Sequence, residues 1–114
     1  MENAGDTKAL YIVINAGFSD GVMEVARAAG AKGATIMNAR GEGALHKSIL
    51  GITVDSEKEI VLMLIDGATA ENIMKKVKES FGLESNAQGI CFTMPVERTT
   101  IINNFPDFRE NKAE

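Results

Sequence analysis

Two glycines bracket a short charged segment, Arg40-Gly41-Glu42-Gly43, which follows a strand-like run over residues 31–39. A packed strand fixes the backbone groups at its end. Glycines beyond it let bare N–H groups approach a ligand, or let a loop hinge outward. The segment therefore predicts either one wall of a binding site or a purely structural turn, and the surrounding elements must decide between the two.

Residue types that serve catalysis are sparse in this chain. His46 is the only histidine; with Lys47 it is interpreted either as a contact for an anion or a partner carboxylate, or as two solvated loop residues. Cys91, the only cysteine, lies in an apolar run and is predicted to be a buried core residue. No pairing of a histidine with a nucleophile and no cluster of metal ligands is evident. The sequence therefore predicts no enzymatic activity and no metal site.

The composition is that of an ordinary globular domain. The chain has 114 residues, of which 45% are hydrophobic and 25% charged, and its net charge is −4. With no basic block and few aromatic side chains, nucleic-acid binding is not expected. No apolar run approaches the roughly 20 residues needed to span a bilayer, and the N-terminus lacks the features of a signal peptide. A cytoplasmic protein that does not insert into membranes is the expectation.

The first half of the chain predicts a strand, a helix and a second strand. Residues 9–15 form a β-branched, apolar run. After the expected N-cap Ser19, apolar residues recur at helical spacing until Gly30, the expected C′ residue. That stripe consists of Val22, Val25, Ala26 and Ala29. Residues 35–37 centre the second strand.

The second half repeats this order. Residues 59–65 form a strand, Thr69 is a candidate cap, and a helical stripe ends at Gly82 before a strand at residues 90–94. The stripe consists of Ala70, Ile73, Met74, Val77 and Phe81. Two such units in series predict β-α-β-β-α-β, an α+β fold of the ferredoxin-like kind. Its four-stranded antiparallel sheet carries both helices on one face, in a single domain over residues 1–114 with a core at 8–97.

The two central strands are joined by an unusually long connection, residues 40–58. A plain hairpin needs about two to five residues, so this segment is either disordered or functional. Extension of the strands into a protruding arm is one expectation. The tail, residues 98–114, is mostly polar but contains an apolar island at 105–108, which docks either on a neighbour or on the same chain.

Four segments of this sequence resemble the PII signal-transduction family. They are residues 31–36 running into Arg40-Gly41-Glu42-Gly43, the long connection, the second strand–helix unit, and the strand ending in Met94-Pro95-Val96-Glu97. They occur in the family's order and at similar separations, and the resemblance covers about residues 8–100.

The resemblance implies a homotrimer whose three sheets face a central axis, with small effectors, above all adenine nucleotides, bound in clefts between subunits. The long connection corresponds to the T-loop, which changes conformation on binding and acts on a target such as a membrane transporter or a metabolic enzyme in nitrogen regulation. Glu42 contacts either a ligand or a neighbouring cation, or is a solvated turn residue. The expected cleft residues are Thr35, Arg40, Gly41, Glu42, Gly43 and Gly89.

Several departures from the family affect its phosphate contacts. Ala44-Leu45 replaces an arginine and a glutamine, and Ala87-Gln88-Gly89-Ile90 stands where the family presents glycine-aspartate-glycine-lysine. Only Arg98 is basic where the family places two arginines, and the shorter T-loop lacks the modified tyrosine. A triphosphate needs cations or aligned N–H groups to replace its water. We therefore expect weak or no binding of ATP in the usual mode, and a less charged effector such as a mononucleotide, a cyclic nucleotide, a small anion or a metabolite.

Together these features predict a PII-like regulator that senses a small effector at subunit clefts and acts through residues 42–58. The alternative is a ligand-independent trimeric interaction module. A small acylphosphatase-like enzyme is the third candidate, although its phosphate loop needs an arginine that the turn at residues 15–20 lacks.

Overall fold

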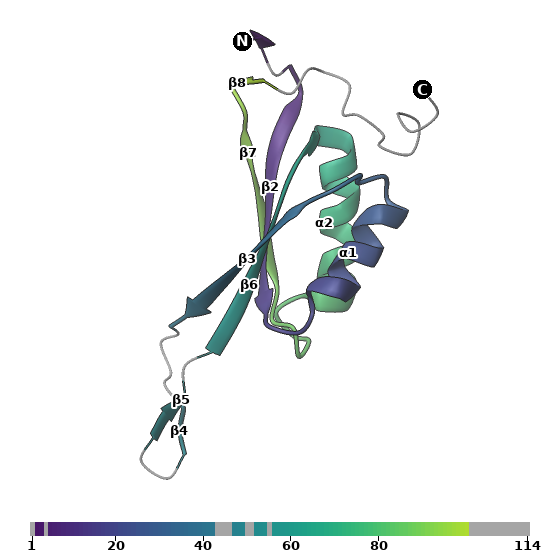
Figure 1. Ribbon diagram of the computed structural model, residues 1–114. Helices are drawn as coiled ribbons and strands as arrows, with labels where there is room; N and C mark the ends of the chain where they lie inside the picture. The colour runs from purple at the N-terminus through teal and green to yellow at the C-terminus, as the bar shows by residue number, and fades with distance from the viewer. Residues whose placement is uncertain (1, 4, 43–46, 50–51, 55, 101–114) are drawn as a thin grey trace, which may run out of the picture.

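The protein was analysed as a computed structural model, which describes residues 2–3, 5–42, 47–49, 52–54 and 56–100. Its main sheet is antiparallel, with the strand order β3-β6-β2-β7. The strands are β2 (Thr7–Asn15), β3 (Thr35–Gly41), β6 (Ser56–Asp66) and β7 (Ile90–Pro95). Helices α1 (Ser19–Ala28) and α2 (Gly67–Phe81) cover the same face of this sheet (Figure 1). The predicted ferredoxin-like arrangement is confirmed.

Alternation along the central strands divides the sheet into two faces. One face packs under the helices and buries Leu10, Ile12, Ile14, Val61, Met63 and Ile65. The helices contribute Val22, Met23, Ala26, Ala70, Ile73 and Val77 to the same cluster. The core therefore lies between the sheet and the helices, where the two apolar stripes predicted it. Neither α1 nor α2 covers the other face, and it is called the open face below.

The predicted C-terminal end of α1 is observed, but the two predicted N-caps are not. Gly30 follows the end of α1 with φ +114°, as a C′ glycine should. Ser19 is not the N-cap, because the helix begins at this residue and Phe18 precedes it without a side-chain cap. Thr69 is also not a cap: the carboxylate of Asp66 accepts hydrogen bonds from its backbone N at 3.0 Å and its hydroxyl at 2.7 Å. The hydroxyl hydrogen bond is the largest cause that lowers the pKa of Asp66.

Four short strands lie outside the main sheet, and none was predicted, because two or three residues are too few to show a period. They are β1 (Glu2–Asn3), paired with β8 (Arg98–Thr99), and β4 (Lys47–Ile49), paired with β5 (Ile52–Val54). Since β3 runs to Gly41 and β6 begins at Ser56, the long connection is an arm that projects from the sheet, and β4 and β5 lie on it (Figure 1). The expectation of a protruding arm is confirmed for the described residues.

Some predicted features lie outside the described residues, namely Gly43, His46 and the apolar island at residues 105–108. Across the described ranges, no helix is long and apolar enough to cross a membrane.

Candidate functional site

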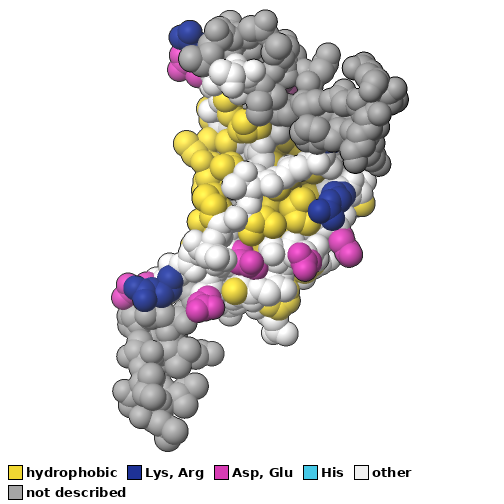
Figure 2. All heavy atoms as spheres, in the orientation of Figure 1, with side chains coloured by type: hydrophobic (Ala, Val, Ile, Leu, Met, Phe, Trp, Pro, Cys, Tyr) yellow, Lys and Arg dark blue, Asp and Glu magenta, His cyan; other side chains and the backbone are white. Residues whose placement is uncertain are grey.

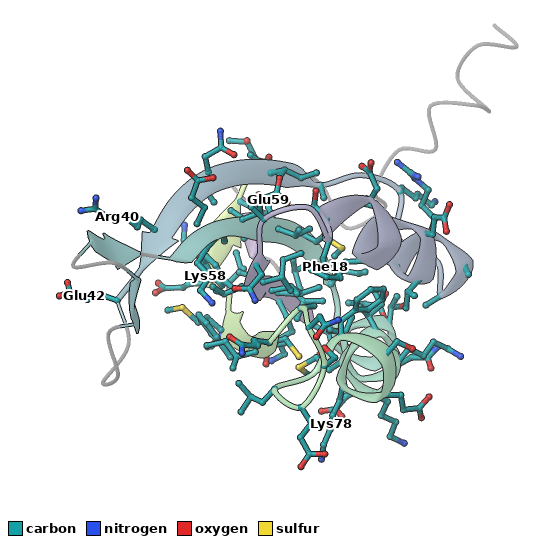
Figure 3. The ribbon with its side chains drawn as sticks, turned by 90° about the horizontal axis from the view of Figure 1, so that it is seen from below. Phe18, Arg40, Glu42, Lys58, Glu59 and Lys78 are labelled. Carbon is teal, nitrogen blue, oxygen red and sulfur yellow. The ribbon has the colours of Figure 1, made fainter. Side chains whose placement is uncertain are left out.

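The root of the arm is the end of β3. Arg40 and Gly41 are its last residues, paired with Glu57 and Ser56 of β6, and Glu42 follows directly. The side chains of Arg40 and Glu42 are exposed and lie toward the arm, seen from below in Figure 3. The root therefore presents one cation and one carboxylate to solvent, close to where the resemblance places the nucleotide cleft.

Gly41 has a steric role that its place in the sequence did not show. A Cβ atom at this position would come within 2.7 Å of Cε and 3.2 Å of Cγ of Lys58. The aliphatic part of the Lys58 side chain therefore runs across the bare backbone of Gly41. Any larger residue at position 41 would push this lysine aside.

Thr35 lies at the other end of β3 from Gly41. They are six residue steps apart along the strand, which is about 20 Å at roughly 3.3 Å per residue. Thr35 pairs with Leu62 of β6, whose side chain belongs to the open face. Within one chain, the structure does not bring Thr35 and Gly41 together around one small molecule.

The second candidate element is the loop over residues 82–89, which connects α2 to β7 and is called the α2–β7 loop. Gly89 is buried at its end, and its N–H donates to the carbonyl of Phe81 at 2.7 Å. Gln88 N donates to the carbonyl of Ser85 at 3.1 Å, and Ala87 N donates to the Ser85 hydroxyl at 3.2 Å. The three N–H groups just before β7 thus have partners within the chain. In this conformation they do not form a ready cradle for phosphate.

A polar network joins this loop to the sheet. Asn15, the last residue of β2, accepts a hydrogen bond from Nζ of Lys58 at 2.7 Å through its side-chain oxygen. Its side-chain nitrogen donates to the carbonyl of Asn86 at 2.8 Å, and its backbone N donates to the carbonyl of Ala87 at 2.8 Å. On the helix side of the sheet, Glu59 accepts from Gly17 N at 2.9 Å. The loop is therefore held to the strand ends by specific hydrogen bonds.

Gly41 and Gly89 lie toward the same end of the sheet but at opposite edges. Gly41 ends the edge strand β3, Gly89 precedes the edge strand β7, and β6 and β2 lie between them. Three strand spacings of about 4.8 Å place these edges roughly 14 Å apart. A small molecule in contact with one glycine does not reach the other glycine of the same chain.

The open face of the sheet is largely apolar. Its large side chains are Tyr11, Val13, Met37, Ile60, Leu62, Leu64, Ile90, Phe92 and Met94, as the strand register shows. The rings of Tyr11 and Phe92 stack at 5.0 Å, and Phe92 and Met94 are 44% and 51% exposed. Figure 2 shows apolar side chains gathered along the strands. Contiguous exposed apolar surfaces of this kind are typical of interaction sites.

Neither a metal nor a reactive thiol is indicated by the geometry. Within the described ranges, no group of three or more histidine, cysteine, aspartate or glutamate residues could hold a metal ion. Cys91 is half-buried against the core, somewhat less enclosed than predicted, and this burial raises the pKa of its thiol. A raised pKa disfavours the thiolate that a nucleophile needs.

A comparison with known protein families identifies the family of this chain. The family profile described as "Nitrogen regulatory protein P-II" matches residues 7–104, which is most of the chain. The chain belongs to the P-II family. No curated protein sequence matches it.

Solved PII structures share its fold at low sequence identity. A PII-like signalling protein of Thermus thermophilus has 23% identity and a TM-score of 0.60, covering 77% of this chain and 83% of its own. GlnK of B. subtilis in complex with ATP has 15% identity and a TM-score of 0.67, with coverages of 90% and 94%. CPII, a nitrogen regulatory PII-like protein of Thiomonas intermedia bound to ADP, AMP and bicarbonate, has 14% identity and a TM-score of 0.64, with coverages of 84% and 96%.

Two residues of this PII protein were missed by reasoning from the sequence. Lys58 lies in a mixed charge run with Glu57 and Glu59, and such runs are typical of a solvated strand end. Asn15 was predicted only as the end of the first strand, residues 9–15, and as the start of the turn that lacks a basic residue. A signal existed for Lys58, because strand alternation places it on the face opposite Glu57 and Glu59. Nothing local predicts its bond to Asn15, which joins residues 43 positions apart.

Proposed function

We propose that this PII family member is a homotrimeric regulator, without catalytic activity of its own, that binds a small effector in clefts between subunits. One observation carries this proposal: the arm root at Gly41 and the α2–β7 loop at Gly89 lie at opposite edges of one sheet. A small ligand touches both only where the root of one subunit meets the loop of the next. The apolar open face supplies the surface for such an assembly.

The effector that fits best carries less charge than a triphosphate. The N–H groups of Ala87, Gln88 and Gly89 are engaged within the chain, Nζ of Lys58 donates to Asn15, and Arg40 is an exposed cation at the arm root. Removing polyphosphate from water without cations or free donors is costly. The GlnK structure contains ATP, and the CPII structure contains ADP, AMP and bicarbonate. These relatives support an adenine nucleotide or a small anion, and the hydrogen bonding within this chain favours AMP or bicarbonate over ATP.

Titration calorimetry with ATP, ADP, AMP, cyclic AMP, bicarbonate and 2-oxoglutarate tests this proposal. We expect AMP or bicarbonate to bind more tightly than ATP. In Arg40→Gln that affinity should fall by about tenfold, because a hydrogen bond to a charged group is worth roughly 1.5–3 kcal/mol. Lys78→Gln removes the same charge from an exposed position on α2, away from the arm root, and should leave the affinity unchanged (Figure 3). A silent panel on an assembled protein would favour the ligand-independent interaction module.

We further propose that the arm, which connects β3 to β6 over residues 42–55, contacts the regulated partner, a transporter or a metabolic enzyme. An isolated two-stranded hairpin such as β4 and β5 is marginally stable in water, so a partner surface would stabilise it. Replacing residues 44–56 with a short glycine-serine linker should reduce partner recovery in an affinity capture by about tenfold or more. Oligomeric mass and effector affinity of the shortened protein serve as controls. Equal recovery with and without the arm would show that the partner binds elsewhere.

A further inference from the structure

The side chain of Asn15 connects the two regions that we assign to the effector site. Its oxygen accepts from Nζ of Lys58 at 2.7 Å, and its nitrogen donates to the carbonyl of Asn86 at 2.8 Å. One end of the amide therefore faces strand β6, and the other faces the α2–β7 loop. Both hydrogen-bonding ends of this side chain are in use.

These contacts continue across the sheet in a line. Ala39, Lys58 and Asn15 are register partners on the adjacent strands β3, β6 and β2. The Lys58 side chain runs across Gly41 at the arm root, because a Cβ there would come within 2.7 Å of its Cε atom. In Figure 3, Arg40 and Glu42 lie on the side of the arm, whereas Lys58 lies nearer the body of the sheet. The line from Gly41 through Lys58 and Asn15 to Asn86 thus leads from one edge of the sheet to the loop beside the other edge.

The chemistry of this bridge requires an amide. Lys58 needs an acceptor, and the carbonyl of Asn86 needs a donor, and a short amide side chain offers both from one planar group. An aspartate would keep the acceptor for Lys58 but lose the donor to Asn86. The neighbouring carboxylate of Glu59 does not replace it, because Glu59 is held by Gly17 N on the other side of the sheet.

We propose that Asn15 is a positioning residue that couples the arm root to the α2–β7 loop through Lys58. This inference rests on the proposed inter-subunit clefts, because each subunit then gives its arm root to one cleft and its loop to the next. A ligand or arm movement that displaces Lys58 breaks its hydrogen bond to the Asn15 oxygen and so weakens the hold on the orientation of the amide. The loop then loses its anchor at Asn86, and the population of loop conformations shifts.

Amide hydrogen exchange tests this bridge without any ligand. In Lys58→Met we expect the amides of residues 87–89 to exchange about threefold faster or more, although Lys58 lies on another strand. Asn15→Asp should raise the same rates, and Lys58→Arg should keep them near the wild-type value. Lys78→Met, on the exposed side of α2, is the matched control and should change nothing there. Unchanged exchange at residues 87–89 in both Lys58→Met and Asn15→Asp would overturn the proposal.

A second measurement tests the Asn15 bridge and the effector assignment separately, so that failure of one can be distinguished from failure of the other. With AMP or bicarbonate as the probe, binding to the wild-type protein should change exchange at both the arm root and residues 87–89. Lys58→Met should leave the ligand-induced change at the arm root in place. The ligand-induced change at residues 87–89 should become smaller, because this substitution removes the link between the arm root and the loop. If neither probe binds the wild-type protein, the effector assignment fails and the ligand-free exchange still decides the bridge. If a probe binds and the loop response is the same in both proteins, the bridge is wrong and the effector assignment stands.

Discussion

We expect Phe92→Glu to convert the assembled protein into a monomer that remains folded. Phe92 lies on the edge strand β7, stacks on Tyr11 and is already 44% exposed in the single chain. A glutamate there is solvated in the monomer. It would be buried against apolar side chains if the open faces of several subunits meet, and burying an unpaired charge costs several kcal/mol per ion.

The expected size of this effect makes it decisive. A cost of about 4 kcal/mol for each subunit that joins the assembly lowers the association constant of that single step by roughly a thousandfold, since each 1.4 kcal/mol is a factor of ten. Light scattering after size-exclusion chromatography at micromolar concentration measures the change, and circular dichroism confirms that the variant is folded. Lys76→Glu is the matched control: Lys76 is exposed on α2, on the opposite side of the sheet from Phe92, so this variant should assemble like the wild type. An assembled Phe92→Glu protein would show that the open face is not the interface.

The elements that sequence reasoning predicted well are those specified by local periodicity. The stripes that contain Val22 and Ile73 identified the buried sides of both helices, and Gly30 and Gly82 marked where the helices end. The strand runs were identified because β-branched and apolar residues gather in them. The resemblance to the PII family rested on the order of such segments, and the family match over residues 7–104 confirms it.

The features that were missed are of two kinds. In one, two nearby residues both suit the same position, and in the other, the interacting residues are far apart in the sequence. Thr69 was predicted as a cap because its residue type suits that position, but Asp66, three residues earlier, offers a charged acceptor. The bridge from Lys58 through Asn15 to Asn86 joins three segments that only the folded sheet brings together. Of the expected cleft residues, Arg40 and Gly41 lie together at the arm root with Glu42 directly after them, whereas Thr35 and Gly89 of the same chain lie elsewhere.

Gly89→Ala should destabilise the fold strongly and detach the α2–β7 loop. A Cβ at position 89 would lie 2.4 Å from the carbonyl oxygen of Phe81 and 3.1 Å from Cγ2 of Ile14. The nearest atom is backbone, and it is the same oxygen that accepts the hydrogen bond from Gly89 N at 2.7 Å. Relief therefore requires the chain itself to move, which breaks this bond. Forcing extra carbon into a packed site costs about 1–3 kcal/mol.

This cost should appear as a lower midpoint in chemical denaturation at a fixed protein concentration, together with faster amide exchange at residues 86–88. Gly33→Ala is the matched control, because a Cβ at Gly33 meets nothing within 4 Å. Its stability should stay within about 0.5 kcal/mol of the wild type, as for most surface substitutions. Equal stability of the two variants would contradict the close approach to Phe81. A destabilised Gly89→Ala protein that still binds AMP with unchanged affinity would restrict Gly89 to packing, and would leave the arm root as the main source of effector contacts.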